Sequence, residues 1–454
     1  MFFSDCGEVQ MIAYIPEACI IFFLANAWSL NRQMGIPKII WPALILLFLY
    51  LQIRPSPQRK IQKKRLRICK NGCLLLRAFL LSTAGSIVYS LLGYMGMLQA
   101  GSLFEDPKLW LLNTVIAICV EAIPFWNGII RLYLTSKQLG IKWRVIGGVC
   151  GMIPVVNLLV LSVLIRTAEK EADFENEKIL LNRKRAEDRI CATRYPILMV
   201  HGVFFRDFRY FNYWGRVPGE LIRNGATIYY GEQPSAASVA ECGEALAERI
   251  RKILKETGAE KINIIAHSKG GLDSRYALSK CGMGDLVASL TTVNTPHRGC
   301  EFADYLLSKI PQAQQNMVAC AYNTALRGIG EINADFFAAV RDLTASACKA
   351  RNEEILDVPG VYYQSVGSIL SHAVSGRFPL NFSWHLVGHF DGRNDGLVGE
   401  ASFPWGEQYQ MLTSQGKRGI SHGDMIDLNR ENFDGFDVRE FYVQLVHDLK
   451  EKGF

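Results

Sequence analysis

Several features that mark small or disordered proteins are missing from this sequence. Its twelve cysteines show no spacing typical of a metal site or a disulfide framework, and no segment has the composition of a disordered chain. With 454 residues, of which 49% are hydrophobic, the chain is too long and too apolar for a disulfide scaffold. Its mean hydropathy of +0.10 is unusually high and argues against a wholly soluble enzyme.

Acidic residues and histidines are scarce in the first third of the chain. Residues 1–165 contain six Asp and Glu, 16 Lys and Arg and no His, whereas residues 191–454 contain 30 acidic residues, 27 basic residues and all eight His. The net charge of +7 therefore arises between apolar segments and not on one folded basic face. We expect no nucleic-acid partner, and we expect a membrane region joined to a domain of a different kind.

Long apolar stretches follow one another in residues 1–165. A helix needs about 20 mostly apolar residues to cross the hydrocarbon core of a bilayer. Five stretches approach or exceed this length, namely residues 11–30, 36–53, 73–98, 109–134 and 145–165. We therefore predict an α-helical membrane bundle of about five spans.

Basic residues between the predicted spans indicate their orientation. Residues 54–70 contain eight Lys and Arg and no acid, a composition that would also suit a nucleic-acid-binding tail. Beside apolar spans, the positive-inside rule explains it better and assigns it to the cytoplasm. Three more spans then bring the chain out on the outer face of the cell membrane. Residues 166–194 carry balanced charge and are predicted to form a solvated helical connector.

Some of the ionisable residues within the predicted spans are candidates for function. Glu17 and Glu121 are acidic, and Arg77 lies near the start of the third span. Such residues are functional-site candidates, and a transport role is one interpretation. The other is that Glu121 is a hydrogen-bonded packing residue and that Arg77 extends to the membrane interface.

The composition changes at Tyr195, where short apolar runs begin. Residues 195–202 (YPILMVHG) and 261–271 (KINIIAHSKGG) have the pattern of buried strands that end at turns, and residues 286–296 repeat it. Residues 236–258 have apolar positions at helical spacing and a terminal Gly. This alternation predicts an α/β domain with a mainly parallel sheet over residues 195–454.

Ser268 has the surroundings of a catalytic nucleophile. Residues 266–270 (AHSKG) place small residues two positions before and after it, as a sharp strand-to-helix turn requires. A nucleophilic serine needs a base that is oriented by an acid. In the hydrolase order of Ser, acid and His, Asp395 in a turn-rich loop is the acid and His422 is the base.

Other assignments stay open on the residues alone. Asp395 is also a good turn residue, and three further acids compete with it: Asp391, Asp424 and Asp427. An oxyanion hole needs two backbone N–H groups, which we assign to Lys269 and to Val203 or Phe204, after the strand-ending His-Gly pair. The alternative for that pair is a simple turn.

Residues 195–454 resemble the bacterial triacylglycerol lipases of the α/β-hydrolase superfamily. The likeness rests on five blocks in the family's order: VHG at 200–202, AHSKGGLDSRY at 266–276, LVASLTTVNTPHRGCEFAD at 286–304, NDGLV at 394–398 and SHGDMIDL at 421–428. It implies a triad of Ser268, Asp395 and His422, an oxyanion hole that includes Val203, and a helical lid at about 305–355.

The resemblance also bears on metals and on function. Such lipases often bind a structural calcium through an Asp two residues after the His, a position that Asp424 matches, but no further side-chain ligands are evident. We expect no required cofactor. The expected function is that of a membrane-anchored serine lipase or esterase acting on lipid esters. The alternatives are a lipid acyltransferase and a membrane sensor or transport component with an inactive hydrolase fold.

Overall fold

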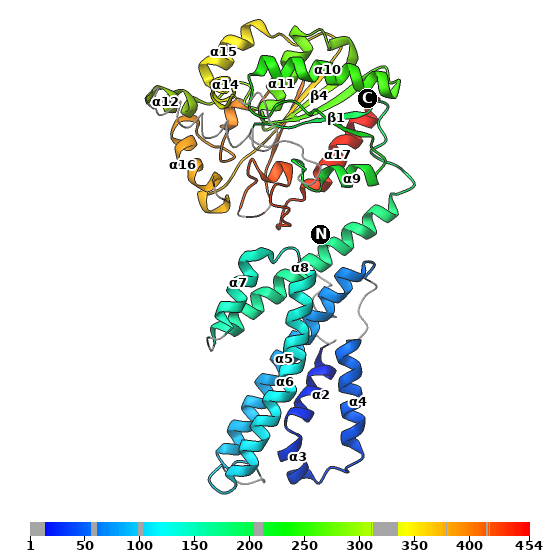
Figure 1. The fold of residues 1–454 in the computed structure, drawn as a ribbon, viewed down its shortest axis with the longest axis vertical. Helices are drawn as coiled ribbons and strands as arrows, with labels where there is room; N and C mark the ends of the chain where they lie inside the picture. The colour runs from blue at the N-terminus through cyan, green and yellow to red at the C-terminus, as the bar shows by residue number, and fades with distance from the viewer. Residues whose placement is uncertain are drawn as a thin grey trace. The chain divides into compact units, whose positions relative to one another are not determined.

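The computed structural model describes two compact units, Met1–Leu181 and Asn182–Phe454. The described residues are 14–55, 61–98, 103–151, 153, 155–203, 212–309, 311, 335–377, 379–414, 416 and 418–454. Figure 1 colours the first unit from blue to cyan and the second from green to red. Each unit has hydrophobic clusters of its own.

The described part of the amino-terminal unit is helical. Its helices are α2 (Ile15–Ala25), α3 (Ala27–Met34), α4 (Ile40–Ile53), α5 (Lys64–Tyr94), α6 (Pro107–Thr135), α7 (Gly140–Cys150) and α8 (Val156–Lys184). Helices α5 and α6 pack closely through two glycines. A Cβ atom added at Gly72 would lie 3.0 Å from the carbonyl oxygen of Gly128, and one added at Gly128 would lie 3.1 Å from that of Gly72. Small residues at this crossing let the two backbones approach.

Two of these helices are long and apolar enough to cross a membrane. They are α5 and α6, which coincide with the predicted spans at 73–98 and 109–134. Helices α2 and α4 are apolar but shorter, with 11 and 14 residues. The prediction of one continuous helix over residues 145–165 is wrong, because α7 ends at Cys150 and α8 begins at Val156. The sequence has Gly151 and Pro154 at this point, and both residue types disfavour a helix interior.

Helix α8 continues from the apolar stretch into the predicted charged connector. The connector is helical as far as Lys184, but its charged side chains are not all solvated. Glu171 is 2% exposed, and it accepts hydrogen bonds from the Ser136 hydroxyl at 2.6 Å and from the backbone N–H of Gln138 at 3.0 Å. It also pairs with Arg65 at 2.6 Å. The first half of the connector therefore packs on the helical unit.

A parallel sheet forms the centre of the carboxyl-terminal unit. Its strands are β1 (Ile197–Val200), β2 (Ile228–Tyr230), β3 (Ile262–His267), β4 (Val287–Val293), β5 (Tyr362–Ser368) and β6 (Gln408–Leu412). They lie in the order β2-β1-β3-β4-β5-β6, and every neighbouring pair is parallel. The predicted α/β class with a mainly parallel sheet is confirmed, and this arrangement is that of an α/β-hydrolase.

Helices cover both faces of the sheet (Figure 1). Alternate strand residues point to opposite faces. Leu198 and Ile264 pack with α10 (Val239–Thr257) and α11 (Lys269–Lys280), whereas Met199 and Ile265 pack with α9 (Val217–Arg223) and α17 (Val438–Glu451). The predicted helix at 236–258 is α10, which begins at a Ser238–Glu241 capping box and ends at a left-handed Gly258.

Further helices follow the fourth and fifth strands. The predicted lid at 305–355 begins within α12 (Glu301–Lys309) and contains α14 (Phe336–Arg341) and α15 (Ala345–Glu354), while residues 312–334 lie outside the described part. A second insertion was not foreseen. Between β5 and the loop of Asp395, the chain forms a short 3-10 turn at Ala373–Ser375 and helix α16 (Leu380–Asp391), which packs on α12.

Candidate active site

Ser268 lies at a strained turn between β3 and α11. Its φ of +56° falls in the left-handed region that non-glycine residues rarely adopt. The turn needs glycine on its far side, because a Cβ atom at Gly270 would lie 2.4 Å from the His201 carbonyl oxygen. Thr295 donates its hydroxyl hydrogen bond to the Ser268 carbonyl at 2.8 Å, and the Ser268 N–H donates to Val293 at 2.9 Å. The serine is therefore held rigidly at the carboxyl edge of the sheet.

Asp395 and His422 lie in hydrogen-bond contact, although 26 residues separate them in the chain. The distance between Asp395 Oδ2 and His422 Nδ1 is 2.6 Å. The Asp395 carboxylate is fully buried and also accepts bonds from the backbone N–H of Val398 at 2.8 Å and from Asn294 Nδ2 at 2.6 Å. The His422 N–H in turn donates to the Asp395 carbonyl at 2.9 Å. These contacts fix both the acid and the ring that it would orient.

The competing acids are engaged elsewhere. Asp391 accepts the N–H of Glu301 at 2.9 Å and so holds the start of α12. Asp427 pairs with Arg216 at 2.7 Å. Asp424 accepts from Arg418 at 2.9 Å and from the Ser421 hydroxyl at 2.7 Å. Of the four acids considered from the sequence, Asp395 is the one that contacts His422.

His267 links the serine to this pair. Its ring is fully buried, and its centroid lies 4.5 Å from the centroid of the His422 ring. Because His267 directly precedes Ser268, this contact brings His422 to the nucleophile's side of the sheet. The Tyr213 hydroxyl lies 2.7 Å from His267 Nδ1. Burial lowers the pKa of His267 well below its usual range, and the nearby His422 imidazole lowers it further.

The sequence interpretation missed this role of His267 and Tyr213. From the sequence, His267 lies inside the turn of Ser268, and its side chain was expected to point away from the site. A contact between residues 54 positions apart leaves no local pattern in a single sequence, so no signal was available. A neutral His267 is well suited to this position because it adds no positive charge beside a base that must become cationic.

The residues proposed for the oxyanion hole flank the serine. A Cβ atom at Gly202 would lie 2.8 Å from Ser268 Cβ, so the chain at His201–Gly202 runs directly against the nucleophile. Val203 follows, and residues 204–211 lie outside the described part. Lys269 is the first residue of α11, where backbone N–H groups have no partner within the helix. Both proposed N–H groups therefore belong to residues next to Ser268.

The Lys269 side chain has a separate structural role. Its Nζ atom is buried and lies 2.7 Å from Asp273 Oδ1 and 3.3 Å from Cys242 Sγ. Burial raises the pKa of Asp273 to about 6, and the Lys269 charge opposes that increase. This ion pair lies within α11, and the contact of Lys269 with Cys242 links the first turn of α11 to α10.

The surroundings of Asp424 do not fit a calcium ion. Both of its carboxylate oxygens accept hydrogen bonds from Arg418, so the positive charge at this position comes from a side chain of the protein. Among the residues with described positions, no group of three or more His, Cys, Asp or Glu is arranged to hold a metal ion. The calcium position implied by the lipase resemblance is therefore not supported here.

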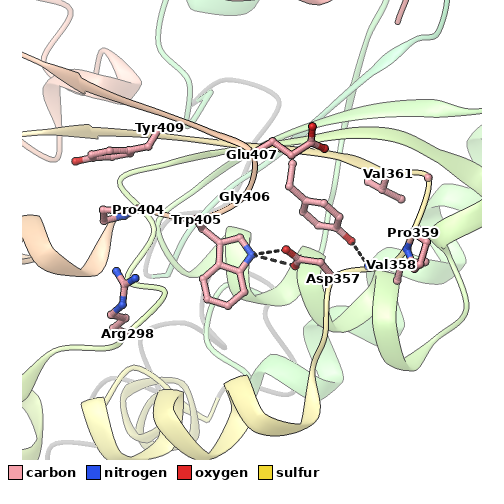
Figure 2. Close-up of a pocket in the computed structure, with 12 residues that line it drawn as sticks. Arg298, Asp357, Val358, Pro359, Val361, Pro404, Trp405, Gly406, Glu407 and Tyr409 are labelled. Atoms are coloured by element: carbon pink, nitrogen blue, oxygen red, sulfur yellow. Dashed lines mark hydrogen bonds between the residues drawn. The ribbon is translucent and has the colours of Figure 1, made fainter.

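A cavity of about 710 Å³ lies where strands β5 and β6 begin, and none of the proposed catalytic residues lines it. Figure 2 shows the Trp405 indole in this cavity, with its N–H directed at Asp357. Arg275 lies 3.5 Å over the Trp405 ring, and His297 stacks on the same indole with centroids 5.1 Å apart. The stacked side chains of Arg275, Trp405 and His297 thus lie at the amino edge of the sheet, whereas Ser268 lies at the opposite, carboxyl edge.

Comparisons with known proteins agree with the motifs. The family model described as "Putative serine esterase (DUF676)" matches residues 230–323. The triacylglycerol lipase of Burkholderia plantarii is 33% identical over 215 residues, which are 44% of this chain and 59% of that protein. The triacylglycerol lipase of Vibrio cholerae is 31% identical over 234 residues, which are 46% of this chain and 74% of that protein.

Among solved structures, the Staphylococcus hyicus lipase is 18% identical with a TM-score of 0.46, and the match covers 57% of this chain and 97% of that one. The matches with the two triacylglycerol lipases span a little over half the length of the B. plantarii protein and nearly three quarters of the V. cholerae protein. Through its carboxyl-terminal unit, the chain belongs to the triacylglycerol lipase family.

Proposed function

We propose that this chain is a membrane-anchored serine lipase that hydrolyses carboxylic ester bonds of lipids through an acyl-enzyme on Ser268. The observation that carries the proposal is the buried 2.6 Å contact between Asp395 and His422, beside a serine held at φ +56°. A histidine oriented by a buried acid is the base that a serine needs to become a nucleophile at neutral pH. The triacylglycerol lipases to which the chain is similar support a lipid ester as substrate.

The proposed reaction has two halves. His422 takes the proton of the Ser268 hydroxyl, and the serine oxygen attacks the acyl carbonyl to form a tetrahedral oxyanion. The N–H groups of Val203 and Lys269 stabilise that oxyanion. His422 then gives its proton to the leaving alcohol. In the second half, His422 activates a water molecule, which releases the fatty acid and restores the serine.

Asp395 orients the base and stabilises its cationic form. Its second oxygen, Oδ1, accepts from the backbone N–H groups of Leu397 and Val398 at 2.9 and 2.8 Å. These backbone donors hold the carboxylate without adding a mobile charge. The other oxygen of the carboxylate, Oδ2, contacts His422 Nδ1 and accepts a hydrogen bond from Asn294 Nδ2.

The anchor in this proposal is the amino-terminal unit. Helices α5 and α6 meet the length and hydropathy of membrane-crossing segments, and the basic residues 54–70 precede α5 or form its start. The prediction of an outer-face catalytic unit depended on a fifth continuous span, which the break between α7 and α8 removes. In addition, Asp173 of α8 lies 2.8 Å from Lys70 of α5, at the basic end of that helix. These contacts favour the cytoplasmic side for the catalytic unit.

The proposed serine chemistry is tested with a fluorophosphonate probe, which reacts with activated serines. We expect the full chain to be labelled in membranes, and we expect Ser268→Ala and His422→Ala to lose the label. The same membranes should release fatty acid from triacylglycerol or phospholipid only when Ser268 is present. An unlabelled wild-type chain would reject the enzyme and favour the inactive binding module.

The orientation is tested by proteolysis of cells that express the chain with a tag after Phe454. We expect the tag to be protected in intact cells and digested after permeabilisation. Digestion in intact cells would restore the outer-face assignment. This result would leave the proposed chemistry unaffected.

A further inference from the structure

Glu17 in the helical unit is a buried carboxylate without a partner. Its side chain is 1% exposed, and neither carboxylate oxygen accepts a hydrogen bond in the part of the chain that the structure describes. Helix α2, which carries it, packs against α4, α5 and α6. Figure 1 shows α2 running beside these helices within the first unit. The surroundings of Glu17 are therefore the interior of a helix bundle and not solvent.

Arg131 is the cation that acts on Glu17, but the two groups are not paired. Arg131 lies within electrostatic range of Glu17, yet no ion pair within 4.0 Å joins these two described residues. Instead, Arg131 Nε donates to Asn127 Oδ1 at 2.9 Å, and its Nη2 donates to the Gln52 carbonyl at 2.7 Å. The acceptors of the guanidinium are thus neutral groups.

Two further charged groups on the helices that pack against α2 are engaged elsewhere. Arg77 of α5 pairs with Glu169. Glu121 of α6 accepts hydrogen bonds from three hydroxyl groups, those of Ser82 at 3.2 Å, Thr83 at 2.7 Å and Ser86 at 2.9 Å. Helix α4 contains no charged residue. Arg131 is consequently the nearby cation that would stabilise an ionised Glu17.

Opposite charges buried near each other are expected to pair, because each stabilises the other against the cost of leaving water. Glu17 and Arg131 remain apart, and an ionised carboxylate with no donor is strongly disfavoured inside an apolar bundle. Both facts are explained if Glu17 is uncharged. We propose that Glu17 is a proton-binding site of the helical unit and that it pairs with Arg131 when the proton is lost.

The exchange needs no further reactant. On binding, a proton from water forms an O–H bond with one carboxylate oxygen of Glu17. On release, the proton returns to water and the carboxylate becomes an acceptor for Arg131, which then leaves Asn127 or Gln52. Gln52 Nε2 is also buried and has no acceptor among the described residues. The site therefore has two arrangements, which differ in the contact between α2 and α6.

The first test is labelling of the full chain in detergent with a hydrophobic carbodiimide, which reacts with protonated carboxyl groups, followed by mass spectrometry of the peptides. We expect the label on Glu17, whose carboxyl group is buried and accepts no hydrogen bond among the described residues. In Arg131→Gln, labelling of Glu17 should persist to higher pH, since the cation that favours its ionised form is gone. Arg131→Lys is the matched control and should retain the wild-type pH range.

Two results would overturn the proposal: no label on Glu17 at any pH, or protection of Glu17 by sodium or potassium at constant pH, which would indicate a cation site. Labelling should be the same in Ser268→Ala, so a failure here is separate from a failure of the proposed hydrolase.

A second measurement does not depend on reagent access. An amide has the shape and charge of a protonated carboxyl group, so Glu17→Gln should leave the thermal unfolding temperature of the full chain unchanged. Glu121→Gln should lower it, because an amide nitrogen replaces an oxygen that accepts a hydroxyl hydrogen bond. Equal losses of stability in the two variants would show that Glu17 is ionised and would reject the proton site.

Discussion

The two units hold their buried carboxylates in different ways. In the helical unit, Glu121 is surrounded by hydroxyl groups of Ser82, Thr83 and Ser86. In the catalytic unit, Asp395 accepts from two backbone N–H groups, those of Leu397 and Val398, in addition to its side-chain contacts. The cause is the backbone itself. The N–H groups in the middle of a helix are used internally, so a carboxylate that packs there must recruit side chains, whereas Glu171 reaches the backbone N–H of Gln138 beyond the end of α6.

This difference explains why the chemistry lies in the second unit. The carboxyl ends of parallel strands lead into turns whose N–H groups are not used by the sheet. Those turns hold Asp395, present the proposed oxyanion donors and position His422. The middle of a helix offers no such donors. Glu121 accordingly accepts from side-chain hydroxyl groups, and Glu17 accepts no hydrogen bond among the described residues.

The largest effect that would test this comparison is on turnover. Asp395→Asn should keep the fold, because the amide can still accept from Leu397 and Val398, but it should reduce kcat by about 10⁴-fold, as in serine hydrolases whose triad acid is replaced. The measurement is steady-state hydrolysis of a soluble ester. Asp391→Asn is the matched control, since Asp391 caps α12, and it should retain most of the activity. Full activity of Asp395→Asn would mean that another acid orients His422.

A smaller effect should be confined to the helical unit. Gly72→Ala places a methyl group 2.9 Å from Arg131 Cβ and 3.0 Å from the Gly128 carbonyl oxygen, and overpacking of this kind typically costs about 1–3 kcal/mol. Thermal unfolding of the full chain in detergent measures the loss. In Gly148→Ala the methyl group meets no atom within 4 Å, so a similar or slightly higher stability is expected. Soluble-ester turnover should not change in either variant if the first unit serves as anchor.

The smallest effect concerns the pH dependence of stability. The pKa of His267 is lowered in the folded chain, so below the ordinary histidine pKa of 6.5 the unfolded chain binds a proton that the folded chain does not. Stability therefore falls as the pH falls, by up to about 1.4 kcal/mol per pH unit for one such group. His267→Gln should reduce this slope in urea unfolding between roughly pH 6.5 and pH 5.

His385→Gln provides the control, since that side chain is exposed on α16 and the slope should stay as in the wild type. Buried His297 also has a lowered pKa, so part of the slope should remain in His267→Gln. An unchanged slope in His267→Gln would mean that its ring takes up a proton in the folded state.

Much of the catalytic unit was predictable because its signals are local. The helix at 236–258 carries its own cap at each end, and the small residues around Ser268 report a turn that only they can form. The pairing of Asp395 with His422 followed from the order of motifs. Spacing alone could not establish this pairing, because Asp391, Asp424 and Asp427 also lie near His422 in the sequence. The structure excludes these three acids by showing their other partners.

The helical unit was less predictable, since apolar length does not say where a helix stops. Gly151 and Pro154 were visible in the sequence, yet the five-span interpretation gave them no weight. The burial of Glu171 depends on contacts with Ser136 and Arg65 from other helices, which no local pattern reports. For the same reason, the sequence did not predict helix α16. It also did not predict the contact between Tyr213 and His267.

Arg418 has a consequence for the loop that carries His422. The cation that neutralises Asp424 is part of the chain, so it is present at one copy per protein and cannot be diluted or removed by a chelator. Its high local concentration comes from the short connection between residues 418 and 424. The order of the His422 loop should accordingly not depend on the concentration of free calcium around the protein.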